Sequence, residues 1–224
     1  MKRTALVAGA TGLVGSNLLQ RLLHDPAYTR VKALVRKPLA LEHGRLETVV
    51  TDFADLATLG SALAADDVYC CLGTTLRRAG SREAFAAVDE SLVVALAQAS
   101  RAAGAQQFIV VSSIGASEHA LSFYARVKGR MERAVAAAGF DAVHIVRPSL
   151  LLGARDEERP AEALAQRWAP TLSKLCQGPL LRYRPVRGEE VAEAMVRLAL
   201  RGEHGTHIHH LPLPDDSEGA EDSD

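Results

Sequence analysis

Tyr124 and Lys128 are the residues of this sequence with the clearest capacity for chemistry. A spacing of four places both side chains on one face of a helix, so an ammonium can lie beside the phenol. An unperturbed tyrosine pKa of about 10 is too high for efficient proton transfer at neutral pH, and a neighbouring cation lowers it. Ser113 ends the preceding apolar stretch, where its hydroxyl can hold a substrate oxygen. Taken alone, the Tyr–Lys pair also fits an exposed helical face.

A second motif is a glycine-rich loop that directly follows the first apolar stretch. Gly9 suits a tight turn, Gly12 allows close approach to a pyrophosphate, and Gly15 allows a helix to pack on a strand. Because a strand precedes the loop and a helix follows it, we predict dinucleotide binding rather than a plain strand-to-helix turn. The residues assigned to the cofactor in this loop are Gly9, Thr11, Gly12, Leu13, Val14 and Gly15.

The end of the second predicted strand indicates which dinucleotide binds. Sites that prefer NAD place Asp or Glu about 20 residues beyond the glycine loop. This sequence has Arg36 at that distance from Gly15, followed by Lys37. A guanidinium binds a 2′-phosphate through charge-assisted bonds, whereas a carboxylate would repel it. We therefore predict NADP(H), with NAD(H) as the less favoured cofactor and a solvated basic turn as the alternative interpretation.

The elements that position these residues can be predicted from hydrophobic patterning. Continuous apolar runs indicate strands buried on both faces, and helical patterns lie between them, which predicts an α/β fold with a doubly wound parallel sheet. The predicted strands are Thr4–Ala8, Val31–Val35, Val68–Leu72, Phe108–Val111 and Val143–Val146, with weaker ones at Glu47–Val50 and Thr206–Leu211. The predicted helices include Leu13–Leu23, Leu56–Leu63, Phe85–Ala103, Phe123–Ala138 and Glu189–Arg201.

Patterning and charge also predict the organisation of the chain. We expect a Rossmann core over residues 1–149, a small substrate-side lobe over 150–214 and a disordered acidic tail over 215–224. The tail holds six acids and no bases, so the preceding 214 residues have 26 bases against 21 acids and a net charge of +5. A mildly basic body suits a small anionic ligand and gives little support to nucleic-acid binding.

Composition places the chain among ordinary globular proteins. Of its 224 residues, 48% are hydrophobic and 24% charged, and no apolar run approaches the length of about 18 residues that a membrane helix needs. The three cysteines (Cys70, Cys71 and Cys176) do not form a disulfide framework, which predicts a reducing, cytoplasmic location. We expect a small-molecule substrate, no nucleic-acid or membrane partner, and a monomer or homodimer.

With these motifs, the chain resembles the short-chain dehydrogenase/reductase superfamily, and within it the atypical Tat-interacting-protein-like oxidoreductases. The resembling stretches span roughly residues 4–200 and include Gly9–Gly15, Cys71–Thr75, Val111–Ala116, Phe123–Gly129 and Arg147–Arg155. The resemblance implies that Tyr124 is the acid/base, that Lys128 binds the nicotinamide ribose and tunes Tyr124, and that Ser113 orients the carbonyl. Ser113 and Tyr124 are closer together in this sequence than in the common branches of the superfamily.

The resemblance implies further cofactor contacts and an activity. The contacts it implies are Asp52 and Phe53 for adenine, Leu72, Gly73, Thr74 and Thr75 for ribose and phosphates, and Pro148 to Leu151 beside the nicotinamide. The implied activity is hydride transfer between NADPH and a small carbonyl or alcohol. The alternative is a regulatory protein that senses NADPH and binds a protein partner with little turnover. A nucleotide-sugar epimerase or dehydratase is less favoured, because the C-terminal region is small.

Other polar clusters carry weaker predictions. Arg155 and Arg159 follow the segment expected beside the nicotinamide and are candidate substrate ligands. His207 and His209 share one face of a predicted strand, but no carboxylate or cysteine lies at ligand spacing beside them, so we predict no metal site. Cys70 lies in an apolar run, where cysteine is commonly a small hydrophobic residue.

Overall fold

Most of the strands that the structure describes assemble into one parallel sheet. The computed structural model describes residues 2–152 and 184–213. Within them, seven strands lie in the order β3-β2-β1-β4-β5-β6-β9, and every neighbouring pair runs parallel. The strands are β1 (Arg3–Ala8), β2 (Tyr28–Val35), β3 (Leu46–Val50), β4 (Asp67–Cys70), β5 (Gln107–Val111), β6 (Ala142–Arg147) and β9 (Gly205–His210). The predicted α/β fold with a parallel sheet is therefore confirmed.

The order of the strands locates the crevice of the sheet. The chain moves outward from β1 to β2 and β3, then returns to the other side of β1 with β4 and continues to β5 and β6. Dinucleotides bind in doubly wound sheets where this direction reverses, beyond the carboxyl ends of the strands. Here the reversal lies between β1 and β4, so the loops after Ala8 and Cys70 flank the crevice.

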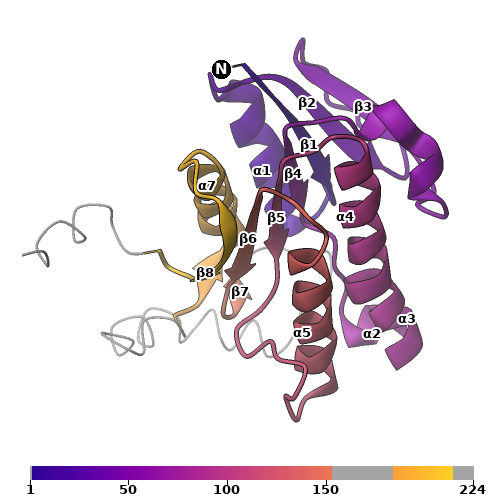
Figure 1. Cartoon of the computed structure of the whole chain (residues 1–224), viewed down its shortest axis with the longest axis vertical. Helices are drawn as coiled ribbons and strands as arrows, with labels where there is room; N and C mark the ends of the chain where they lie inside the picture. Colours follow the sequence, from indigo (N-terminus) through magenta and orange to yellow (C-terminus); the bar gives the residue numbers. More distant parts are fainter. Residues whose placement is uncertain (1, 153–183, 214–224) are drawn as a thin grey trace, which may run out of the picture.

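Helices cover both faces of the sheet, as Figure 1 shows. One face packs against α1 (Leu13–His24) and α7 (Gly188–Ala199), which contact each other. The hydrophobic core on this side includes Leu18 of α1 and Met195 of α7. The other face packs against η1 (Leu56–Leu63), α4 (Val93–Ala102) and α5 (Phe123–Ala136). The hydrophobic core on this side includes Phe108 of β5 and Met131 of α5. Burial on both faces explains why the strands are continuous apolar runs in the sequence.

The predicted helix Phe85–Ala103 is divided in the structure. A short helix, α2 (Leu76–Ala79), precedes α3 (Arg82–Ala86), and a π-helical turn, η2 (Ala87–Leu92), joins α3 to α4. The wider turn places Asp89, which is 1% exposed, inside the protein. Because π-helical turns often occur at functional sites, this departure from regular α-helix makes Asp89 a candidate site residue.

The C-terminal elements belong to the main layers. The boundary expected at residue 150 assigns α7 and β9 to a small lobe packed on the core, and in the structure β9 pairs with β6 and α7 packs on α1. Gly188 makes the second contact possible, because a Cβ there would lie 2.8 Å from the Leu13 side chain. A small parallel pair, β7 (Leu151–Leu152) and β8 (Val186–Arg187), joins the two described ranges. None of the helices in those ranges is both long and apolar enough to cross a membrane.

The buried His144 of β6 predicts a pH-dependent stability. His144 is fully buried, and desolvation, followed by repulsion from His209, His207 and Arg201, lowers its pKa from 6.5 to about 4. The unfolded chain therefore binds a proton between pH 6.5 and 4 that the folded chain does not bind. The free energy of unfolding is therefore unaffected by the titration of His144 above pH 6.5, and it decreases as the pH falls from 6.5 towards 4.

We expect this effect to amount to about 3 kcal/mol of unfolding free energy. Urea unfolding in buffer containing a chelator measures the unfolding free energy at pH 7 and at about pH 4. The decrease between the two pH values should be larger in the wild type than in His144→Phe by that amount. The variant removes the titrating ring and retains an aromatic side chain. Equal losses in the two proteins would show that His144 does not contribute to the acid sensitivity.

Candidate functional site

The glycine loop forms a backbone cradle at the reversal point of the sheet. Gly9 has a φ of 83°, and a Cβ there would lie 2.6 Å from the carbonyl oxygen of Cys71. The Gly12 amide donates to the Gly9 carbonyl at 3.0 Å, and a Cβ on Gly15 would lie 2.1 Å from that same oxygen. No described side chain caps α1 at Gly12, so its first amides are available to a phosphate. The cradle therefore fits the pyrophosphate of a dinucleotide.

Arg36 lies at the same edge as the residues predicted to contact adenine. Val35 ends β2 and pairs with Val50, the last residue of β3, so Arg36 and Asp52 follow neighbouring parallel strands. Arg36 is exposed, and within residues 2–152 and 184–213 it forms no salt bridge. Phe53 adopts a φ of 67°, unusual for a residue with a side chain, and packs against the core beside η1. The arrangement leaves the guanidinium available to an anionic ligand.

Lys128 is held by a buried carboxylate. Its Nζ lies 2.8 Å from Asp89 Oδ1, and the two side chains are only 5% and 2% exposed. Burial alone would lower the pKa of Lys128, but attraction to Asp89 and then to Tyr124 outweighs it, so the pKa is raised. Lys128 therefore stays an ammonium at neutral pH, and it faces both the carboxylate of η2 and the phenol of α5.

Asp89 also organises the loop after β4. Its Oδ2 accepts a hydrogen bond of 2.7 Å from the amide of Thr74, and a Cβ on Gly73 would lie 3.2 Å from its Oδ1. The same Cβ position is 3.9 Å from Lys128 Nζ. Thr75 ends the loop by accepting a hydrogen bond from Arg78 at the start of α2. The predicted ribose and phosphate loop is thus joined to Lys128 through a single carboxylate.

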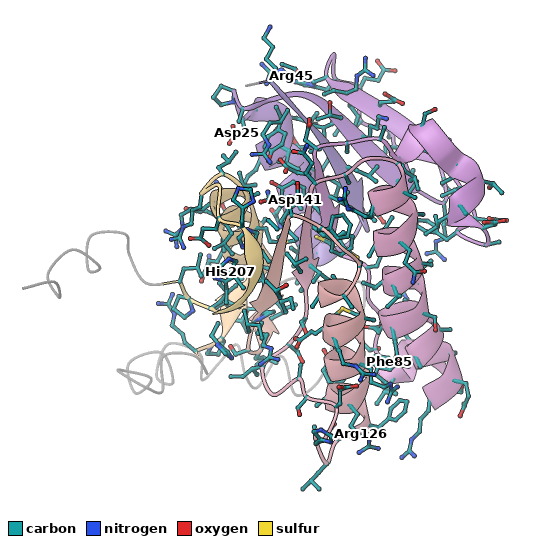
Figure 2. The ribbon with its side chains drawn as sticks, viewed as in Figure 1. Asp25, Arg45, Phe85, Arg126, Asp141 and His207 are labelled. Carbon is teal, nitrogen blue, oxygen red and sulfur yellow. The ribbon has the colours of Figure 1, made fainter. Side chains whose placement is uncertain are left out.

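Tyr124 lies in the first turn of α5 and is half-buried. Its ring packs on Phe85 of α3, with centroids 5.4 Å apart. Phe123 also packs on Phe85, and the Arg82 guanidinium is 5.3 Å from the Phe123 ring centroid. Figure 2 shows Phe85 towards the end of the molecule where α5 begins. This aromatic contact fixes the phenol one helical turn from Lys128.

The two serines after β5 have different surroundings. Ser112 Oγ donates to Glu132 Oε1 at 2.5 Å, and Arg147 binds the same carboxylate through two nitrogens, at 2.9 and 2.5 Å. Among the described residues, Ser113 Oγ has one hydrogen bond, of 3.4 Å to the Ile114 carbonyl, and Ser113 is 8% exposed. Ser112 therefore belongs to a structural network, whereas Ser113, which is predicted to hold the substrate oxygen, lies outside that network.

That network also fixes the segment expected beside the nicotinamide. Arg147 donates to the carbonyl of Ala116 at 3.0 Å, and the amide of Ile114 donates to the carbonyl of Pro148 at 3.0 Å. Leu151 begins β7, which pairs with β8. The ends of β5 and β6 are thus held together at the edge of the sheet where the crevice opens. Arg155 and Arg159, the candidate substrate ligands, lie outside the described residues, as does the predicted tail.

Sequence reasoning misses the role of two acidic residues. Neither Asp89 nor Glu132 is among the predicted site residues. Asp89 lies four residues after Phe85 and four before Val93, on one face of the predicted helix. Glu132 lies four residues after Lys128, so both acids could have been flagged on helical faces that also hold residues of the predicted core or site. Their partners stay hidden in the sequence, because a buried charge requires a counter-charge that the fold alone identifies.

Cys70 behaves as the sequence predicts for a thiol in an apolar run. It is fully buried, and desolvation raises its pKa to about 12. The thiol is therefore protonated at neutral pH and is not a nucleophile.

Known proteins with similar sequences support a dinucleotide site. A family described as NAD(P)H-binding matches residues 9–173. The protein Fmp52 of Emericella nidulans is 38% identical over 182 residues, which cover 78% of each chain. The protein HTATIP2 of Rattus norvegicus is 34% identical over 174 residues, covering 76% of this chain and 72% of the relative.

The solved structures with a similar fold include two that contain a bound nucleotide sugar. MoeE5 in complex with UDP-glucose and NAD has a TM-score of 0.69 at 21% identity, covering 92% of this chain and 74% of that chain. A UDP-N-acetylglucosamine 4-epimerase from Methanobrevibacter ruminantium has a TM-score of 0.70 at 19% identity, covering 94% of this chain and 77% of that chain. At these identities the likeness establishes the Rossmann fold alone.

One prediction is overturned by the comparisons. The cysteine content predicts a cytoplasmic protein, but the Fmp52 relatives of Emericella nidulans and Eremothecium gossypii are named mitochondrial. Free thiols indicate a reducing environment and do not identify which compartment provides it, so the inference from cysteine to cytoplasm is wrong.

The family match, the relatives and the glycine cradle lead to one assignment. The match covers most of the chain, and it begins at Gly9, the first residue of the cradle. The two relatives, at 38% and 34% identity, cover 78% and 76% of the chain. The chain therefore belongs to the NAD(P)H-binding family of Rossmann proteins, and its relatives include HTATIP2 and Fmp52.

Proposed function

We propose that the protein is an NADP(H)-dependent oxidoreductase acting on a small carbonyl or alcohol. The observation that carries this proposal is the placement of a half-buried tyrosine one turn from a buried, protonated lysine. Tyr124 and Lys128 share the face of α5 that looks towards Asp89 and the loop after β4. An exposed surface pair would have neither the burial nor the carboxylate partner. When bound, the cofactor supplies or accepts the hydride.

The remaining chemistry belongs to residues of this chain. Tyr124 donates a proton to the carbonyl oxygen during reduction and accepts it during oxidation, and the ammonium of Lys128 lies one helical turn away on the same face of α5. Ser113 holds the same oxygen through its available hydroxyl. Asp89 keeps Lys128 charged and oriented. Because Asp89 also binds the Thr74 amide, the proton-transfer group and the cofactor loop share one support.

The experiment that tests the proposal separates binding from turnover. Fluorescence titration of the purified protein with NADPH and with NADH should show tighter binding of NADPH. A panel of small aldehydes and ketones should then produce carbonyl-dependent NADPH oxidation. Tight NADPH binding without oxidation by any carbonyl would favour the regulatory alternative. Failure to bind either dinucleotide would contradict the oxidoreductase and the regulatory function alike.

Cofactor choice is proposed to depend on Arg36. Replacing Arg36 with glutamate should raise the dissociation constant of NADPH by about 10–100-fold, because a charge-assisted contact to the 2′-phosphate becomes a repulsion. The dissociation constant of NADH, which has no such phosphate, should change much less. Arg30→Glu provides a matched control, since Arg30 is an exposed residue of β2 paired with Glu47. An equal loss for both dinucleotides would argue against a role for Arg36 in selectivity.

A further inference from the structure

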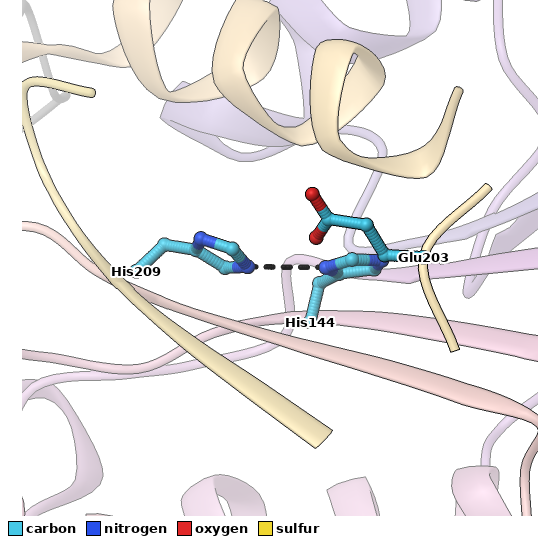
Figure 3. Close-up of side chains that lie close together, drawn as sticks. All are labelled: His144, Glu203 and His209. Atoms are coloured by element: carbon cyan, nitrogen blue, oxygen red, sulfur yellow. Dashed lines mark hydrogen bonds between the residues drawn. The ribbon is translucent and has the colours of Figure 1, made fainter. Parts of the chain in front are cut away.

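Three side chains with metal-binding atoms converge beside the edge strand β9. They are His144 of β6, His209 of β9 and Glu203 of the turn that precedes β9. One potential ligand atom from each lies within 4.8 Å of the other two. His144 Nδ1 and His209 Nε2 face each other at 3.1 Å, and the Glu203 carboxylate lies beside the His144 ring (Figure 3).

His144 is an unusual residue for its position. Its exposure is 0%, and its neighbours in β6, Val143 and Ile145, are buried apolar residues. Its Nε2 has no hydrogen-bond partner among the described residues, and its Nδ1 meets another imidazole. Buried polar atoms are normally satisfied, and an apolar side chain would fit this strand at lower cost. A metal ion bound between His144 Nδ1 and His209 Nε2 would account for a histidine at this position, although it would leave His144 Nε2 without a partner in the described ranges.

The geometry and chemistry of the group suit zinc. Two imidazole nitrogens bound to one tetrahedral Zn²⁺ are separated by about 3.3 Å, close to the separation observed here. Metal ions bind the neutral form of histidine through a ring nitrogen, and the ring nitrogens of His144 and His209 already face each other. A carboxylate is a common third ligand in such sites.

We propose that His144, His209 and Glu203 bind a zinc ion, with water as the fourth ligand. The ion would join β6, β9 and the turn between α7 and β9. β6 and β9 are the last two strands at one edge of the sheet and are separated from β4 by β5, so the site lies away from the crevice between β1 and β4 and has a structural role. Glu203 lines an open depression of about 450 Å³, which gives solvent access.

Two residues beside the proposed ligands bear on metal binding, one because it contacts Glu203 and the other because it lies near His144 without being a ligand. Arg201 Nη1 lies 3.8 Å from Glu203 Oε1, and this contact must be released when the carboxylate binds an ion. His207 stacks on His144 with centroids 5.6 Å apart, but its Nε2 is bonded to the His204 carbonyl at 2.8 Å. His207 is therefore outside the ligand set, and it provides a matched control on the same strand.

The test is metal binding to the untagged full chain after treatment with a chelator. Calorimetry with Zn²⁺, and visible spectroscopy with Co²⁺, should show one ion per chain in tetrahedral coordination. His209→Ala and Glu203→Gln should each weaken binding by at least about tenfold, whereas His207→Ala should leave it unchanged. Both substituted ligands are half-buried, so the variants should fold, which thermal unfolding without metal checks.

A second readout distinguishes this site from adventitious binding. At a hundredfold excess over the dissociation constant, Zn²⁺ should raise the wild-type Tm by about 5–10 °C. The rise should be lost in His209→Ala and retained in His207→Ala. Absence of saturable binding to the wild type would overturn the proposal. Binding that survives in both His209→Ala and Glu203→Gln would do the same, because the ion would then lie elsewhere.

Discussion

Replacing Tyr124 with phenylalanine should lower kcat for carbonyl-dependent NADPH oxidation by about 10²–10⁴-fold, the usual contribution of a general acid or base. The substitution removes only the hydroxyl, and the phenylalanine ring can keep the packing against Phe85. Lys128 and Asp89 keep each other as partners in the variant. The dissociation constant of NADPH should therefore stay close to that of the wild type.

The measurement is a pair of assays on the same preparations, steady-state oxidation of NADPH and its binding by fluorescence. Phe123→Leu is the matched control, because it disturbs the adjacent ring that packs on Phe85 without removing a hydroxyl. This control should retain most of the activity. Undiminished kcat in Tyr124→Phe would remove Tyr124 from the mechanism. A parallel loss in Phe123→Leu would assign the effect to packing instead.

Introducing a single methyl group at Gly15 should abolish dinucleotide binding and destabilise the fold. A Cβ there would lie 2.1 Å from the Gly9 carbonyl oxygen and 2.8 Å from its carbon. Both obstacles are backbone atoms of the cradle, so no side-chain rotation relieves the clash. The start of α1 must move away from β1, which opens the cradle and disturbs the packing of α1. We expect Gly15→Ala to lower the unfolding free energy by about 3 kcal/mol or more.

Gly44→Ala provides the control for this substitution. Gly44 is exposed, and a Cβ there would have no atom within 4 Å. The unfolding free energy of the Gly44→Ala variant should stay within about 0.5 kcal/mol of the wild-type value. Urea unfolding measures stability, and NADPH titration at low urea measures binding. Wild-type affinity in Gly15→Ala would show that the close approach of α1 to the Gly9 loop is not required for the cofactor.

Local patterns carry much of the information about the fold. Val31–Val35 lies within β2, the predicted helix Leu13–Leu23 lies within α1, and the predicted Phe123–Ala138 differs from α5 only at its last two residues. These elements are predictable because strand and helix periodicity, and the glycine at a turn, act within a few residues. The helix Phe85–Ala103 is less well predicted, because the π-helical turn depends on burying Asp89 against Lys128.

In the candidate site, too, the local features could be predicted from the sequence and the contacts between distant residues could not. The glycine spacing and the spacing of Tyr124 and Lys128 are local features, and the amino-acid pattern was enough to place them at the starts of helices. Packing between distant elements paired Lys128 of α5 with Asp89 of η2, assigned Ser112 to Glu132, and brought His144 to His209. These pairings could not be predicted, because buried charges and imidazoles need partners, and the identity of a partner depends on which strands and helices pack together.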